Sequence, residues 1–402
     1  MTGIVKTDQI QGAGSSTVTI PSGTALNVTT VSGTPAFSGD VTLPSINGGQ
    51  IGGRRNMVIN GAMQVAQRGT SQASISSAGY YTIDRFKINT NDAGVWTMSQ
   101  EALSSSDTPF TEGFTKALKL DCTTSATPAS NGTLQVQYST EGQDLQQLAS
   151  GTSSAKTLIL SFWIKATKTG TNVLGGYQDD GGKSFGLTYT INSSNTWEYK
   201  TITIPANTAD VIANDGTRGR IVTWYFSAGT NRTTGTLRST WTTYATADEA
   251  PGQVNHADNT ANNIHITGVQ LEVGSQATAF EHRSFGEELA LCQRYFFQLN
   301  GIGNEYATMG AGAMYQAAMY LGAFQLPVAM RTRPSFSLNN SLSSTNFSVV
   351  TAGQVKAISG VTPTGDNQHL RINAAITSNG TVGDGAYIQL QSGYSVLWDS
   401  EL

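Results

Sequence analysis

Apolar and polar residues alternate in short runs through the central part of the chain, from about Asn56 to Arg283. In TLILSFWIKA (157–166), Leu160 and Phe162 share one face of an extended chain, and WEYKTITI (197–204) alternates in the same way. Turn residues interrupt the pattern about every ten to twenty residues. Such alternation is typical of half-buried strands. About ten strands are predicted, which suits a β-sandwich of the jelly-roll type over residues 54–283.

Residues 1–53 have a different pattern. Short β-type triplets, such as Val18–Ile20 and Val41–Leu43, are separated by Ser-Gly and Pro-Ser-Gly turns, and Phe37 is the only aromatic residue. Each triplet is too small to bury a core, so the segment is ordered by pairing with other chains or a partner, or it stays a flexible leader. We interpret it as an attachment and shaft segment, because the strand signals recur at regular intervals.

One helix is predicted over residues 284–300. Ser284 and Glu287 have the spacing of a capping box. Leu289, Cys292 and Phe296 follow at intervals that place them on one helical face, and Asn300-Gly301 provides an end signal. The helix is expected to link the sandwich to a further unit.

β-patterns return in residues 301–402, where turns such as Ser378–Gly380 separate short apolar runs. We predict a second, smaller β-sandwich there. The predicted fold class is therefore all-β: an extended N-terminal segment, a central jelly roll, a short linking helix and a C-terminal smaller β-sandwich.

Composition narrows the possible functions. Only 12% of residues are charged and the net charge is −4, which argues against nucleic-acid binding, because that requires a concentrated excess of Lys and Arg. No apolar run approaches the length that spans a bilayer, and the N-terminus lacks the apolar core of a secretory signal. We expect a soluble protein that does not insert into membranes. Cys122 and Cys292 are expected to be buried thiols.

Catalytic patterns are weak. The four histidines form no metal-binding or nucleophile pattern. Gly182–Gly186 matches G-x-S-x-G, but the preceding stretch is a polar turn and the following one is strand-like, unlike a nucleophile elbow. Acidic pairs such as Asp179 and Asp180 are interpreted as solvated loop residues rather than a glycosidase pair. We therefore expect no catalytic residues, no enzymatic activity and no cofactor.

Aromatic residues near Gly, Asn or Asp are the more useful signal, because the C–H face of a sugar stacks on aromatic rings. Most aromatics in such a chain belong to the core, and the sequence does not separate the two groups. The candidate glycan contacts are Trp96, Tyr177, Trp224, Trp241 and Tyr244. Glu272 and Glu281, near the end of the sandwich, form a weak candidate site for a structural Ca²⁺.

Two passages of the sequence carry a family resemblance. NMVINGAMQVAQRGTS (56–71), followed by YYTIDRFKI (80–88), is similar to the opening of a sandwich module common in the tail-fibre proteins of tailed bacteriophages. ITGVQLEVGSQATAFEHRSFGEELALCQRYF (266–296) is similar to its closing strand and exit helix. Matching residues such as Gly61, Asp84 and Arg85 are interpreted as fold-defining, with Asp84 and Arg85 as a candidate buried charge pair.

The resemblance implies a virion structural protein with a jelly roll like that of carbohydrate-binding modules. Its partners would be host surface polysaccharide and, through the N-terminal segment, other virion proteins. The expected location is the virion, most simply the tail, with host cytoplasm during assembly. A homotrimer is expected, also because the short N-terminal strands need partners from other chains.

Three function classes follow. The first is a non-enzymatic tail fibre whose weak glycan contacts are multiplied by avidity. The second is a capsid decoration or head-fibre protein. The third is a polysaccharide depolymerase similar to a tailspike, which requires a carboxylate pair that the sequence does not show.

Overall fold

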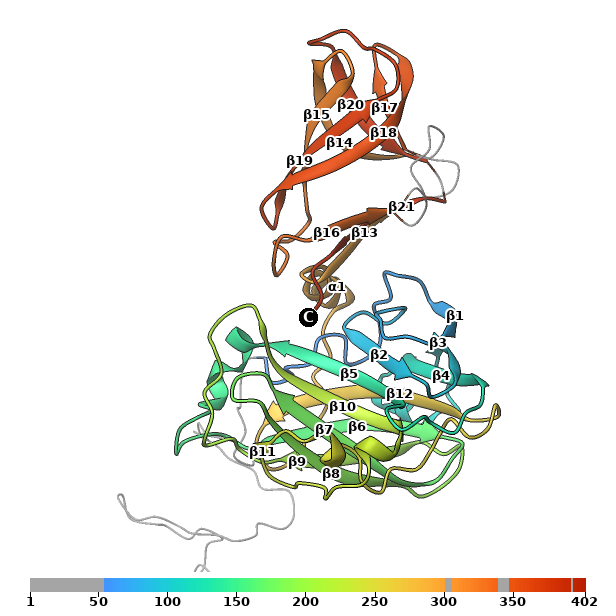
Figure 1. Ribbon diagram of the computed structural model, residues 1–402, viewed down its shortest axis with the longest axis vertical. Helices are drawn as coiled ribbons and strands as arrows, with labels where there is room; N and C mark the ends of the chain where they lie inside the picture. Colours follow the sequence, from blue (N-terminus) through green and yellow to red (C-terminus); the bar gives the residue numbers. More distant parts are fainter. Residues whose placement is uncertain (1–53, 301–305, 339–346, 392) are drawn as a thin grey trace, which may run out of the picture. The chain divides into compact units, whose positions relative to one another are not determined.

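The computed structural model describes residues 54–300, 306–338, 347–391 and 393–402. Within these residues the chain is almost entirely β-structure, with a single α-helix (Figure 1). The prediction of an all-β fold is confirmed. The predicted attachment segment, residues 1–53, lies outside the described residues.

The central part is a sandwich of two six-stranded antiparallel sheets that lie face to face (Figure 1). The first sheet has the order β1 (Ser71–Ile75), β3 (Val95–Ala102), β4 (Lys116–Thr124), β12 (Asn263–Val273), β6 (Leu158–Ala166) and β9 (Glu198–Ile204). The second has the order β11 (Thr242–Thr243), β8 (Lys183–Ile191), β7 (Gly170–Gln178), β10 (Arg218–Ala228), β5 (Thr133–Glu141) and β2 (Phe86–Asn91). Because the chain crosses repeatedly between the sheets, the sandwich is of the predicted jelly-roll type.

The alternation seen in the sequence decides which side chains enter the core. On β6, Leu160, Phe162 and Ile164 are fully buried, whereas Trp163 between them faces outward and is half-buried. Phe162 meets Trp224 of β10 edge-to-face, with ring centroids 5.7 Å apart, across the space between the sheets. Burial of large apolar side chains from both sheets supplies the main stabilisation of the sandwich.

Short 3₁₀ turns and one helix connect the strands. The turns comprise Thr108–Glu112, Gly142–Leu148, Thr230–Arg232 and Thr246–Asp248. Helix α1 covers Phe285–Gln293, and the Ser284 hydroxyl accepts a hydrogen bond from the Glu287 N–H at 3.3 Å, as the capping pattern predicts.

The helix is shorter than predicted. Phe296 does not continue the apolar stripe of Leu289 and Cys292, because it begins strand β13 (Phe296–Asn300) and pairs with Asp399. Ladder partners on β21 (Ser395–Asp399) satisfy the backbone here in place of further helical turns.

The C-terminal part contains a three-stranded sheet and a closed barrel. The small sheet has the order β13, β21, β16 (Ser335–Leu338). The barrel has the order β14 (Ala307–Gln316), β15 (Met319–Gln325), β19 (His369–Ile376), β18 (Gln354–Gly365), β17 (Phe347–Thr351) and β20 (Gly385–Leu390).

The predicted β-strands of this part are present, but they form a closed barrel rather than a second two-layer sandwich. Strand β20 pairs with both β14 and β17, so the sheet closes on itself and no barrel strand is left as an edge. Phe297, Phe324 and Trp398 stack between the small sheet and the barrel, with Trp398 5.0 Å from Phe324 and 5.5 Å from Phe297. This stack joins the two sheets into one apolar core.

A buried polar network surrounds Asp84 and Arg85, but these two residues do not pair with each other. Arg85 forms an ion pair with Glu401 near the end of the chain. Asp84 lies 3.8 Å from Arg68 and accepts hydrogen bonds from Gln67. Burial raises the pKa of Asp84 to about 6, although Arg68 opposes the shift. Although they are adjacent in sequence, Asp84 and Arg85 therefore interact with different residues.

Cys122 and Cys292 are buried free thiols, as predicted. Among the described residues no helix has the length and apolar character needed to cross a bilayer.

Candidate functional site

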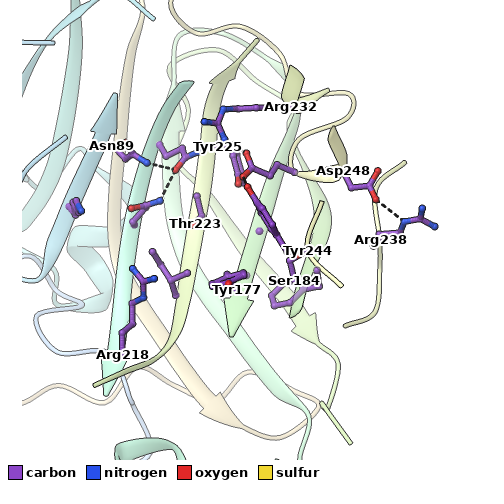
Figure 2. Close-up of a pocket in the computed structure, with 18 residues that line it drawn as sticks. Asn89, Tyr177, Ser184, Arg218, Thr223, Tyr225, Arg232, Arg238, Tyr244 and Asp248 are labelled. Carbon is purple, nitrogen blue, oxygen red and sulfur yellow. Dashed lines mark hydrogen bonds and ion pairs between the residues drawn. The ribbon is translucent and has the colours of Figure 1, made fainter. Parts of the chain in front are cut away.

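A groove of about 410 Å³ lies on the outer face of the second sheet. Strands β2, β5, β10, β7 and β8 form its floor, and residues 232–249 form one wall (Figure 2). Period-two alternation explains the floor: Trp224 and Phe226 of β10 point into the core, so Thr223 and Tyr225 point into the groove. Gly175 of β7 lacks a side chain where a Cβ would lie 2.8 Å from the Tyr225 ring, which leaves room for that ring.

Two tyrosines form an aromatic corner of the groove. The rings of Tyr177 and Tyr244 are 5.5 Å apart at an interplanar angle of 79°. Tyr244 is held there because its N–H donates to the Gly182 carbonyl at 3.0 Å and its hydroxyl donates to Glu249. Partial burial and the Glu249 carboxylate raise the pKa of the Tyr244 phenol, so this hydroxyl stays protonated at neutral pH.

A row of amides crosses the opposite part of the floor. Gln135 Oε1 accepts hydrogen bonds from Asn89 Nδ2 at 3.1 Å and from Gln137 Nε2 at 2.6 Å (Figure 2). Gln135 in turn donates to the Thr133 hydroxyl at 2.9 Å. These bonds fix the orientation of the side chains, and within the described part of the chain the amide oxygens of Asn89 and Gln137 accept no hydrogen bond. Such oriented amides are suited to the hydroxyl groups of a sugar.

Most charges at the groove are already paired. Arg218 makes a two-point ion pair with Asp179, with both distances 2.7 Å, and Arg238 pairs with Asp248 at 3.0 Å. Arg232 pairs with Glu249. Lys87 is the exception: its ammonium makes no ion pair or hydrogen bond within the described part of the chain and lies 6.0 Å from the centre of the Tyr80 ring. The groove is therefore mainly a neutral, hydrogen-bonding surface.

The structure places the five predicted aromatic contacts in different environments. Tyr177 and Tyr244 line the groove. Trp241 lies behind it, 4.8 Å from Phe185, and its indole N–H donates to the Pro205 carbonyl. Trp96 and Trp224 are fully buried in the sandwich core, so they are not accessible to a ligand in this fold. An aromatic residue on a strand can face either way, and the sequence alone does not distinguish the two.

The amide row of the groove was not predicted from the sequence. The alternation in LQVQYSTE (134–141) contained the signal: Leu134, Val136 and Tyr138 enter the core, so Gln135 and Gln137 must share the opposite face. Two glutamines in register on an outer sheet face are a signal for an exposed hydrogen-bonding surface.

Glu272 and Glu281, the candidate calcium ligands, both accept hydrogen bonds within the protein. Both oxygens of Glu272 accept hydrogen bonds from neighbouring groups, including the Thr278 N–H at 2.8 Å and the Thr278 hydroxyl at 2.7 Å. Glu281 accepts from the Asn56 N–H at 2.6 Å. No group of three or more His, Cys, Asp or Glu side chains that could hold a metal ion is found among the described residues.

The G-x-S-x-G stretch falls on strand β8, and Ser184 pairs with Thr242 of β11. No helix follows the serine, in agreement with the sequence analysis. Asp180 accepts a hydrogen bond from the Ala213 N–H at 2.8 Å, and Asp179 forms an ion pair with Arg218.

No protein-family model and no curated protein matches the chain. Among solved structures, the chain is similar to the enzymatically active domain of tailspike protein 4 of bacteriophage CBA120, with 12% identity and a TM-score of 0.28. That match covers 54% of this chain and 21% of the tailspike, so the chain spans about a fifth of that protein.

Two smaller proteins match over their whole length. A family 11 carbohydrate-binding module of a cellulosomal cellulase of Clostridium thermocellum is 12% identical, with a TM-score of 0.25, and the match covers 52% of this chain and 100% of the module. A putative sugar binding protein from Bacteroides thetaiotaomicron is 12% identical, with a TM-score of 0.27, and the match covers 55% and 100%. At TM-scores this low, neither the fold nor the function of this chain follows from these similarities.

Proposed function

We propose that the groove on the second sheet binds a polysaccharide chain, and that the protein is a non-enzymatic tail-fibre protein of a bacteriophage that contacts host surface glycans. The observation that supports glycan binding is the combination of the Tyr177–Tyr244 corner with the amide row of Asn89, Gln135 and Gln137. Aromatic faces take the C–H surface of a sugar, and amides take its hydroxyls. The phage assignment is supported by the sequence resemblance of residues 56–88 and 266–296.

Binding without hydrolysis is part of this proposal. Asp248 and Glu249 are the carboxylates of the groove, and each is paired with an arginine. A hydrolase needs one acid to give a proton and a second to act as base or nucleophile. Hydrogen bonds from the Thr236 N–H and from Arg238 lower the pKa of Asp248, so this carboxyl group is poorly suited to the proton-donating role.

Avidity would make weak individual glycan contacts sufficient for attachment to a host surface. In a homotrimer attached to other virion proteins through residues 1–53, each groove is presented in several copies, and repeated weak binding yields firm attachment. The same sandwich on a capsid decoration or head-fibre protein would use its surfaces for assembly, and imaging of labelled protein on the virion, at the tail or at the head, separates the two assignments.

The groove is tested by replacing Tyr177 with alanine. We expect the affinity for host surface polysaccharide to fall about tenfold, because loss of one stacking ring removes roughly 1.4 kcal/mol of binding free energy. Affinity electrophoresis of the full chain in gels containing the polysaccharide measures the change. The control is Tyr315→Ala, which removes a tyrosine that is 57% exposed on barrel strand β14. Equal retardation of the Tyr177 variant and the unchanged protein would contradict the proposed site. Release of reducing ends from the polysaccharide would instead support a depolymerase.

A further inference from the structure

A second groove, of about 610 Å³, lies on the outer face of the first sheet. Strands β6, β9 and β12 contribute Trp163, Tyr199 and Gly268, and the segment after β12 contributes residues 277–280 and His282. Leu160 and Phe162 of β6 point into the core, so Trp163 points away from it. The two grooves therefore lie on opposite faces of the sandwich.

Aromatic rings form two walls of this second groove. On one side Trp163 and Tyr199 lie with ring centroids 5.2 Å apart, and Tyr199 is 44% exposed. On the other side Phe280 lies 4.8 Å from Phe114 and 4.9 Å from His282. Trp163 and Phe280 also pack against a small buried cluster that contains Phe114, whereas Tyr199 is not part of that cluster and stays exposed beside Trp163 on the sheet face. The Trp163 and Tyr199 rings are tilted by 48° to each other and are both partly exposed, and such aromatic faces are suited to a ligand with a flat apolar side.

A β-bulge forms the floor between the walls. The pairing of β12 with β6 shifts register between Thr267 and Gln270, and Gly268 within this shift has a φ of 62°. A Cβ at Gly268 would lie 2.8 Å from Phe114 Cζ and 3.1 Å from Trp163 Cδ1. The missing side chain therefore lets both walls approach the floor, and bulges commonly shape binding sites in this way.

The polar groups of the groove favour a neutral ligand. The indole N–H of Trp163 has no acceptor among the described residues and is not among the buried unpaired atoms, so it can donate to a ligand. His282 Nε2 lies 2.9 Å from the Glu112 carbonyl; its N–H donates there, which leaves Nδ1 as an acceptor. The lining contains no Lys or Arg that would attract an anion, and the carboxylate in it, that of Glu112, is exposed to water. Hydroxyl groups satisfy one free donor and one free acceptor better than an ion does.

We propose that this second groove binds a neutral pyranose unit of a glycan, with the C–H face of the sugar on Tyr199 and Trp163. The proposal shares its ligand class with the proposed function but depends on different residues. One sandwich would then contact two glycan chains, or two parts of one chain, on opposite faces. Two sites on one rigid body raise the effective affinity for a dense glycan layer without any new contact between subunits.

The test uses full-length protein labelled with 5-fluorotryptophan, with the Trp163 ¹⁹F resonance assigned from the Trp163→Phe variant. Neutral oligosaccharides of glucan, galactan, xylan and mannan are titrated in turn. We expect one class to shift the Trp163 resonance saturably. Tyr199→Ala should weaken this response about tenfold, whereas Tyr177→Ala, in the other groove, and Tyr315→Ala, on the barrel, should leave it unchanged. Because Tyr199 is exposed, its removal is not expected to unfold the chain.

Three other outcomes would contradict a glycan site in the second groove, and each has a different meaning. Binding that is sensitive to Tyr177→Ala but leaves the Trp163 resonance unmoved would restrict glycan recognition to the first groove and overturn this inference alone. A change in the mass of the protein in solution on Tyr199→Ala, measured by light scattering, would identify the aromatic groove as a contact between copies of the chain. No response at either groove to any of the four oligosaccharides would count against both proposals.

Discussion

Replacing Glu401 with alanine is expected to lower the free energy of unfolding by about 3–5 kcal/mol, because it removes one partner of a buried ion pair. The Glu401 side chain is 5% exposed, and it pairs with Arg85, which is fully buried, and with Arg68 at 3.4 Å. Without Glu401, Arg85 keeps a hydrogen bond to the Ser139 carbonyl at 2.7 Å and lies over the Tyr295 ring at 3.3 Å. Neither contact neutralises its charge.

Urea unfolding of the full chain at pH 7, followed by tryptophan fluorescence, measures the loss of unfolding free energy in the Glu401→Ala variant. The matched control is Asp399→Asn, which removes a carboxylate that also pairs with Arg68, at 3.1 Å, but is 40% exposed. Because water reaches the Asp399 carboxylate, its pair with Arg68 contributes about 1 kcal/mol or less, so this variant should unfold close to the unchanged protein. A Glu401→Ala variant no less stable than Asp399→Asn would show that the buried pair does not hold this region together.

Two further variants separate charge from packing. Glu401→Gln keeps the shape and one acceptor for Arg85, so we expect a smaller loss than with alanine. The double variant Arg85→Met with Glu401→Leu removes both charges and should recover much of the stability, because a buried ion pair is often replaceable by apolar residues.

Acid is expected to destabilise the sandwich through His256. Its ring is fully buried, and burial, followed by the nearby charge of Lys168, lowers the pKa of this histidine to about 3, with Asp258 opposing. The ring is held by its Nε2, 2.9 Å from Asn172 Oδ1, and lies edge-to-face on Phe226 at 5.6 Å. The neutral ring is therefore the form that fits the folded protein.

The direction in which stability changes with pH follows from the pKa values of His256 in the unfolded and the folded chain. An unfolded histidine has a pKa of about 6.5, so the unfolded chain binds a proton below that pH that the folded chain does not bind until about pH 3. The stability that His256 contributes is complete above pH 6.5 and is lost as pH falls towards 3. Between pH 7 and pH 4 this amounts to about 3 kcal/mol, at roughly 1.4 kcal/mol per pH unit.

Unfolding free energies measured from pH 7 to pH 4 test this for the unchanged protein and for His256→Gln. Glutamine cannot take up the proton, so the variant should show a slope smaller by up to about 1.4 kcal/mol per pH unit. His369→Gln is the control, because the His369 side chain is 67% exposed. Parallel slopes for all three proteins would contradict the assignment.

Other buried groups add to the acid response. Burial also lowers the pKa of His265 to about 3, but its Nε2 lies 2.5 Å from Glu101, which favours the charged ring. The prediction therefore concerns His256, which forms no ion pair with any residue that the structure describes. Asp84, whose pKa burial raises to about 6, works in the opposite direction and gains stability as pH falls below 6. The comparison of variants isolates His256 because these groups remain in each protein.

The alternation of apolar residues was sufficient to predict an all-β chain with a central sandwich. A strand with one face in a core must carry apolar residues at every second position, and Leu160, Phe162, Ile202 and Ile204 do so. The start of the helix could also be predicted from neighbouring residues, because the Ser284 cap needs only the N–H of Glu287, three residues further along the chain.

The candidate site could be predicted only in part. Tyr177 and Tyr244 were named from their local sequence, but so were Trp96 and Trp224, which the fold buries. An aromatic ring is compatible with both core and surface, so its placement depends on which face of the sheet it occupies. The second groove depends on a bulge at Gly268 and on packing between β6, β9 and β12, which local pattern does not encode.

By itself, the sequence determined the class of fold and the local structures, because strand alternation, turns and helix caps depend on residues close together in the chain. Tertiary structure alone decided the closure of the barrel, the two grooves and the ion pair between Arg85 and Glu401, whose residues are 316 positions apart. These features arise from contacts between distant segments. Their register is selected by packing and burial of the whole chain rather than by any local preference.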